Sequence, residues 1–231
     1  MRIVRRHASP DTPKLGHRIG EDGKVEIFEI TDNIDFAARP IDTQKISVND
    51  IRDPELDRLE RHRERLNMLI DQRYKNGELD KVAELQKKRI AQSEKIGEAV
   101  ARKHFNNLGY EEVDLPNDLM GNGKQGTFDM VYRDKDGNLV IVEAKGGNSQ
   151  LGSRKLKYGK NKDSRAQQGT KEYMDDIIAN YEAKLGSENS FVKELKKANR
   201  RGNIRYTAVR QPLTKDGSLT GQYKVDEFKI K

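Results

Sequence analysis

The chain has 231 residues, of which 36% are charged and 33% hydrophobic, and Lys and Arg exceed Asp and Glu by 45 to 38, a net charge of +7. With no cysteine, disulfide scaffolds, Cys-ligated zinc, iron–sulfur clusters and thiol nucleophiles are excluded. No apolar run approaches the ~18 residues of a membrane span. The N-terminus also lacks the apolar part of a secretory signal. The positive net charge favours a polyanionic partner.

Residues 1–50 predict an irregular lead-in with little helix. Pro10, Pro13 and Pro40 interrupt any long element. Within this segment only residues 25–31 alternate between apolar and polar side chains in the manner of a short strand.

Residues 51–92 predict a charged helical hairpin. Asp53 followed by Pro54 is a typical helix start. Asn76-Gly77 is a turn signal between two narrow apolar stripes, and the rest of both helices is charged. We interpret the segment as a solvated hairpin, with a partner-binding surface as the alternative.

Residues 93–231 predict one α/β domain with a mixed sheet flanked by helices. Its expected elements are a helix at 93–108, strands at 110–115, 126–134 and 138–145, a helix at 164–185, and strands at 204–213 and 222–230. The whole chain is therefore predicted to be α/β, with a charged helical hairpin ahead of the mixed sheet.

Three charged residues interrupt the two most apolar strands of this domain. They are Asp129, Glu143 and Lys145. Burying a charge without a partner costs several kcal/mol. These side chains therefore require either a metal ion or one another.

The turn between these two strands predicts how the charged residues meet. A three-residue loop at 135–137 commonly places its glycine last, in the left-handed conformation. Asp134 then pairs with Asn138, paired residue numbers sum to 272, and Asp129 lies directly opposite Glu143. A two-residue Asp-Gly loop would instead place Asp129 opposite Ala144, on the other face of the sheet.

Two ionised carboxylates facing each other repel, and a divalent cation between them relieves the repulsion. Oxygen ligands favour Mg²⁺ first and Mn²⁺ second. The ammonium of Lys145 beside such an ion can stabilise hydroxide, orient its attack or neutralise charge on a phosphate. The alternative is a buried structural salt bridge between Lys145 and either carboxylate.

Asp129 followed by Glu143-Ala144-Lys145 after an apolar strand resembles the PD-(D/E)xK superfamily of restriction-endonuclease-like nucleases, although Phe128 rather than Pro precedes the aspartate. The resemblance covers roughly residues 93–185. It implies a restriction-endonuclease-like mixed sheet. It also implies a further acidic ligand on the preceding helix, and a polar residue that assists the site at the start of the next helix. The corresponding residues are Glu98, with Glu94 as the alternative, and Gln168, with Gln167 as the alternative.

The segment EAKGG, a basic loop and RAQQGTKEY is similar to C-terminal nuclease domains of bacterial polymorphic toxins. The resemblance implies an antibacterial DNase with little sequence specificity. It would be exported within a larger carrier or by a specialised secretion system, act in the target-cell cytoplasm and be neutralised by an immunity protein, which we expect to be acidic. An RNase of the same fold, a phage or mobile-element nuclease, and an inactive nucleic-acid-binding or partner-binding module are the alternatives.

The net charge is concentrated in one segment. Residues 145–171 contain eight basic residues and one acid, which equals the whole net charge of +7. We expect this loop to hold DNA or RNA phosphates without reading bases, and a solvated loop is the alternative. The expected nucleic-acid-binding residues are Arg154, Lys155, Lys157, Lys160, Lys162 and Arg165.

Overall fold

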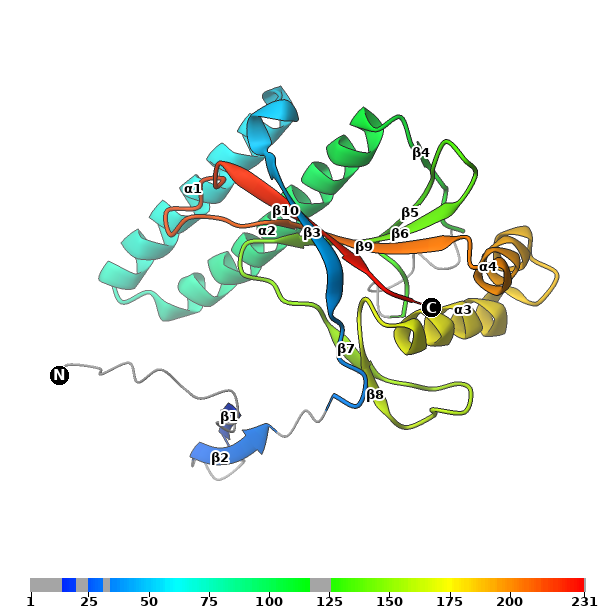
Figure 1. Cartoon of the computed structure of the whole chain (residues 1–231). Coiled ribbons are helices and arrows are strands. Elements are labelled where there is room, and N and C mark those ends of the chain that lie inside the picture. The colour runs from blue at the N-terminus through cyan, green and yellow to red at the C-terminus, as the bar shows by residue number, and fades with distance from the viewer. Residues whose placement is uncertain (1–13, 20–24, 31–33, 117–125, 231) are drawn as a thin grey trace.

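The structure is a computed structural model that describes residues 14–19, 25–30, 34–116 and 126–230 (Figure 1). Its helices are α1 (Pro54–Lys75), α2 (Leu79–Asn107), α3 (Lys171–Leu185), α4 (Ser190–Arg201) and the short 3-10 helix η1 (Val48–Asp50). Its strands are β1 (Lys14–Ile19), β2 (Val25–Ile30), β3 (Pro40–Ser47), β4 (Glu111–Glu112), β5 (Met130–Arg133), β6 (Leu139–Gly146), β7 (Ser153–Lys155), β8 (Arg165–Gln167), β9 (Ile204–Gln211) and β10 (Gln222–Phe228).

Six strands form one mixed sheet in the order β3-β10-β9-β6-β5-β4. β6 and β9 are parallel, and every other neighbouring pair is antiparallel. β1 with β2, and β7 with β8, form separate two-stranded sheets. The prediction of an α/β chain with a helical hairpin ahead of a mixed, helix-flanked sheet is therefore confirmed.

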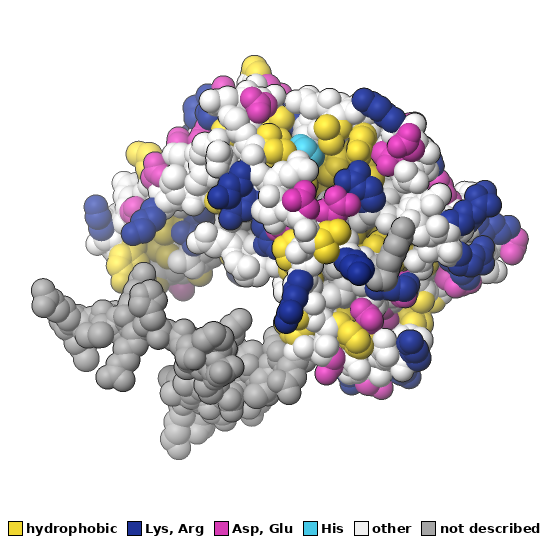
Figure 2. Space-filling model, in the orientation of Figure 1, with side chains coloured by type: hydrophobic (Ala, Val, Ile, Leu, Met, Phe, Trp, Pro, Cys, Tyr) yellow, Lys and Arg dark blue, Asp and Glu magenta, His cyan; other side chains and the backbone are white. Residues whose placement is uncertain are grey.

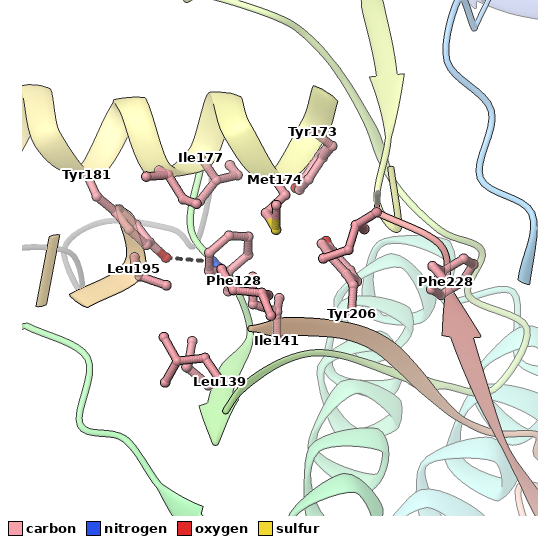
Figure 3. Packing of buried hydrophobic residues seen from close by; sticks show 14 of the residues in the cluster. Phe128, Leu139, Ile141, Tyr173, Met174, Ile177, Tyr181, Leu195, Tyr206 and Phe228 are labelled. Carbon is pink, nitrogen blue, oxygen red and sulfur yellow. Dashed lines mark hydrogen bonds between the residues drawn. The ribbon is translucent and has the colours of Figure 1, made fainter. Parts of the chain in front are cut away.

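Helices cover both faces of the sheet, and side chains of β6 alternate between the two resulting cores. Leu139 and Ile141 pack with residues of α3 and α4, in the core shown in Figure 3. Val140 and Val142 pack with residues of α1 and α2. We call these two sides the α3–α4 face and the α1–α2 face. Glu143 and Lys145 continue the odd-numbered series of β6, so they belong to the α3–α4 face.

The α1–α2 hairpin begins as predicted. The Asp53 side chain caps α1 by accepting a hydrogen bond from the Leu56 N–H at 3.0 Å, and Pro54 is the first helical residue. Apolar side chains are visible over the hairpin's turn end in Figure 2, where Tyr74 and Leu79 are exposed. None of the helices in the described ranges combines the length and apolar character that crossing a membrane requires.

α2 continues through the boundary that was predicted between residues 92 and 93. It is one helix from Leu79 to Asn107, so no separate helix starts at Ser93. No proline interrupts this range, and its one glycine, Gly97, lies inside the helix. The change in composition near residue 93 marks the point where the helix begins to pack on the sheet, with Ile96 and Val100 fully buried.

The hairpin between β5 and β6 has the predicted register. Met130 pairs with Val142 and Arg133 with Leu139, which is the pairing whose residue numbers sum to 272. The Asp134 N–H donates to the Asn138 carbonyl at 3.0 Å, and Gly137 adopts a φ of +79°. The left-handed glycine therefore sets this register, as the loop length predicts.

Further differences from the sequence-based expectation concern α3, α4 and β3. The helix expected at 164–185 begins only at Lys171, because the Thr170 side chain caps it and residues 165–167 pair as β8 with β7. α4 was not predicted, although Asn189 caps it and Phe191, Val192 and Leu195 form its buried stripe. β3 lies in the expected lead-in, yet it pairs with β10 at the edge of the main sheet.

Candidate active site

Asp129, Glu143 and Lys145 lie together on the α3–α4 face. The Lys145 Nζ is 3.6 Å from the Asp129 Oδ2 and 3.6 Å from the Glu143 Oε2. The Glu143 side chain is fully buried, whereas those of Asp129 and Lys145 are 18% and 13% exposed. One ammonium therefore faces two carboxylates, and the cluster opens to solvent on the side of Asp129 and Lys145.

Asp129 is held by a backbone contact across the hairpin. It lies one residue before β5, and its Oδ2 accepts a hydrogen bond from the Ala144 N–H at 3.0 Å. The preceding residue is fixed from the other side, because the Phe128 N–H donates to the Tyr181 hydroxyl at 2.8 Å (Figure 3). These side-chain partners explain why the strand expected from residue 126 starts only at Met130.

Glu143 has a polar partner on each carboxylate oxygen. The Tyr206 hydroxyl of β9 donates to Oε1 at 2.7 Å, and the Gln168 Nε2 donates to Oε2. The Gln168 Oε1 accepts from the Gly152 N–H at 2.7 Å, which orients its amide nitrogen toward Glu143. Gln167 instead accepts from the Ala38 N–H, so the structure places Gln168 rather than Gln167 at the site.

Tyr206 is the residue at this site that sequence reasoning missed. It is fully buried between Phe128 and Phe228, and a buried tyrosine hydroxyl usually has a hydrogen-bond partner. The sequence therefore indicates that the Tyr206 hydroxyl has a partner. It does not indicate that the partner is Glu143, because this contact depends on the parallel register in which β9 pairs with β6.

The environment of Glu143 disfavours its charged form. Burial raises the pKa of the Glu143 carboxyl to about 8, the neighbouring Asp129 adds to the increase, and Lys145 and Tyr206 only partly oppose it. When both carboxylates are ionised, the single charge of Lys145 leaves the cluster with a net negative charge. A hard divalent cation fits this donor set, because Mg²⁺ commonly binds through one or two carboxylates and retains several waters.

Glu98 is not brought to this cluster. α2 packs on the α1–α2 face, while Asp129 and Glu143 point to the opposite face. Glu98 is half-buried on α2 and interacts electrostatically with Arg102, and Glu94 is exposed. In the part of the chain that the structure describes, no three His, Asp or Glu side chains are grouped so that they could hold a metal ion.

The basic segment after Lys145 forms the β7–β8 hairpin. The Arg154 Nε lies 3.2 Å from the buried Asp176 carboxylate, whose other oxygen accepts from the Lys157 and Tyr158 N–H groups at 2.6 and 2.9 Å. Arg154 is thus part of the anchor of this hairpin on α3.

The other predicted phosphate-binding residues of the hairpin are more accessible. Lys155 forms an exposed ion pair with Asp163 at 3.0 Å, and Arg165 donates to the Ser153 hydroxyl at 2.9 Å. Lys157, Lys160 and Lys162 are exposed near the tip. These three lysines are the members of the predicted set that are best placed to meet a polyanion.

No protein-family model, curated protein or solved structure matches the chain. The geometry of the site is therefore the basis for assigning a function.

Proposed function

We propose that this protein is a Mg²⁺-dependent nuclease that hydrolyses phosphodiester bonds and that DNA is its preferred substrate. The observation that carries the proposal is the contact of Lys145 with two facing carboxylates, Asp129 and Glu143, at 3.6 Å each. A structural salt bridge needs only one carboxylate. A second carboxylate, that of Glu143, is buried beside the first and has a raised pKa. This arrangement favours a site that binds a further cation.

Each side chain has a role in this proposal. Asp129 and Glu143 would hold the ion, which supplies positive charge at the scissile phosphate and lowers the pKa of water. Lys145 orients the attacking water and neutralises charge that develops on the phosphate. Gln168 and Tyr206 are positioning residues that hold the two oxygens of Glu143.

A plasmid-nicking assay tests this function. We expect cleavage with Mg²⁺, none with EDTA, and a loss of at least 100-fold in Glu143→Gln and Lys145→Met. Lys87→Met removes an exposed lysine from α2 and should retain full activity. Cleavage that survives EDTA or either site variant would contradict the metal mechanism.

The same assay on RNA decides the polymer. Preferential cleavage of RNA would favour the RNase alternative. Nucleic-acid binding without any cleavage would favour an inactive binding module.

The toxin role and the acidic immunity protein remain predictions that rest on the sequence resemblance. A small acidic protein encoded next to this chain should bind it and inhibit cleavage. Binding that is unchanged after Lys157, Lys160 and Lys162 are replaced by alanine would contradict a contact with the β7–β8 hairpin.

A further inference from the structure

Four basic residues form a row across four neighbouring strands of the main sheet. Lys145 of β6 is the register partner of Arg210 on β9, Arg210 of Lys224 on β10, and Lys224 of Lys45 on β3. Directly paired residues point to the same face of a sheet. The row therefore lies on the α3–α4 face, where it starts at the lysine of the candidate site and ends on β3, the edge strand of the main sheet. Figure 1 shows the four strands β6, β9, β10 and β3 that the row crosses.

The inner and outer members of the row differ in their partners. The Arg210 Nε lies 2.6 Å from the Asp226 Oδ2, and the Thr43 hydroxyl donates to the other oxygen of Asp226 at 2.8 Å. Arg210 is thus fixed in place and only 23% of its side chain is exposed. Lys45 and Lys224 are exposed, and neither forms an ion pair with any residue in the described ranges.

Folding stability does not account for such a row. Like charges directly opposite each other on adjacent strands are destabilising, and three such pairs follow one another here. Of these four residues, only Lys145 and Arg210 form ion pairs with acidic residues in the described ranges. A polyanion laid across the strands would relieve the repulsion that remains between Lys224 and its neighbours.

We infer that this row is a track for the sugar-phosphate backbone of a nucleic acid, which leads from the β3 edge to Lys145. With strands ~4.8 Å apart, the row spans about 14 Å, which is about the rise of four base-pair steps along a duplex axis at ~3.4 Å each. Contacts to phosphate carry no base information, which agrees with a substrate bound without sequence preference. The inference rests on the proposed nuclease function and places its substrate on the sheet, in addition to the β7–β8 hairpin.

The test measures binding separately from cleavage. Fluorescence anisotropy of a labelled 30-base-pair DNA, in EDTA, compares the wild type with Lys45→Ala/Lys224→Ala. The matched control is Lys75→Ala/Lys87→Ala, which removes two exposed lysines from the α1–α2 hairpin and the same charge. We expect the slope of log K against log salt to become shallower by about two in the track variant, about one per lost phosphate contact, and less in the control.

A charge reversal separates lost binding from lost folding. Lys224→Glu places a carboxylate between Arg210 and Lys45, so the melting temperature should hold or rise while DNA affinity falls at least tenfold.

The outcomes also separate the track from the nuclease function. Equal affinity and salt slope in the track and control variants, or no DNA binding by the wild type, would overturn the track. If the wild type does not cleave but the track variant loses binding, the track stands and the nuclease function fails. If the wild type cleaves DNA with Mg²⁺ and the track variant binds DNA as tightly as the wild type, the track fails and the nuclease function stands.

Discussion

Glu143 is the residue on which the proposed chemistry of the site depends most. Its carboxylate is fully buried, yet its hydrogen-bond partners are a neutral amide and a neutral hydroxyl. Lys145 is shared with Asp129, so it does not fully compensate a second negative charge. The residue is therefore held in position while its charged form is unfavourable, and the proposed Mg²⁺ would stabilise that charged form.

This environment predicts a pH-dependent stability in metal-free solution. The pKa of Glu143 rises from 4.5 to about 8 on folding, so between these values the folded state keeps a proton that the unfolded state releases. Stability therefore falls as pH rises through this window. In urea unfolding with EDTA, Glu143→Gln should flatten the slope between pH 5 and 8. The exposed control Glu188→Gln should not. Parallel curves for all three proteins would contradict the buried, protonated Glu143.

Tyr206 should affect the site through Glu143. Tyr206→Phe keeps the ring packed between Phe128 and Phe228 but removes the hydrogen bond that lowers the pKa of Glu143. We expect kcat to fall about tenfold, with little change in KM. The acid limb of the pH–rate profile should move to higher pH, because ionised Glu143 then requires less acidic solution.

Stability measurements complete the test of Tyr206. The free energy of unfolding should fall by about 1–3 kcal/mol, because a buried acceptor loses its donor. Tyr74→Phe, at an exposed position of α1, is the control. If Tyr206→Phe has the same pH–rate profile as the wild type, Tyr206 contributes only to packing.

Among the elements, β6 carries site residues on one face and packs against α2 on the other. It presents Glu143 and Lys145 on the α3–α4 face, while α2 crosses close to its end on the other face. A Cβ added to Gly97 would lie 2.6 Å from the Gly146 nitrogen and 2.7 Å from the Lys145 carbonyl carbon. Both contacts are to backbone, so the helix and the strand that carries the site would have to separate.

Gly97→Ala should therefore destabilise the protein despite the higher helix propensity of alanine. Overpacking of this kind commonly costs about 1–3 kcal/mol. Gly221→Ala is the control, since a Cβ there meets nothing within 4 Å. Urea unfolding measures the difference. A Gly97→Ala protein within about 0.5 kcal/mol of the control, the usual range for surface substitutions, would show that the crossing tolerates a methyl group.

The parts predicted from the sequence are those specified by local signals. The cap at Asp53 and the glycine of the β5–β6 turn lie within a few residues of what they determine, and the turn register placed Asp129 opposite Glu143. β3 was missed because its partner β10 is far along the chain: Thr43 and Asp226 are 183 residues apart. The contact of Tyr206 with Glu143 spans 63 residues and was missed for the same reason.

At the scale of the whole molecule, the main sheet places β3, which precedes the α1–α2 hairpin, beside β10, the last strand. β3 pairs along its length with β10, and Val48 of the following η1 is buried in the core under α1 and α2. The segment expected to be a lead-in therefore contributes both an edge strand and core residues. The α1–α2 hairpin likewise shares one helix with the sheet domain.

Truncation tests this organisation. A protein of residues 34–231 retains β3 and η1, whereas one of residues 51–231 lacks both. We expect the shorter protein to melt at a lower temperature and to aggregate more, because β10 becomes an unpaired edge and the core loses Val48. Thermal unfolding and light scattering compare the two. Equal melting temperatures would show that β3 is dispensable.

The parallel pairing of β6 with β9 also sets the order in which the site can be assembled. Asp129 and the Ala144 N–H are 15 residues apart within one hairpin, whereas Glu143 reaches Tyr206 only across 63 residues that include α3 and α4. Closing the longer loop is slower. We therefore expect Asp129 and Glu143 to come together before Tyr206 forms its hydrogen bond to Glu143. On refolding, cleavage activity should return later than the far-UV circular dichroism. Simultaneous recovery would contradict this order.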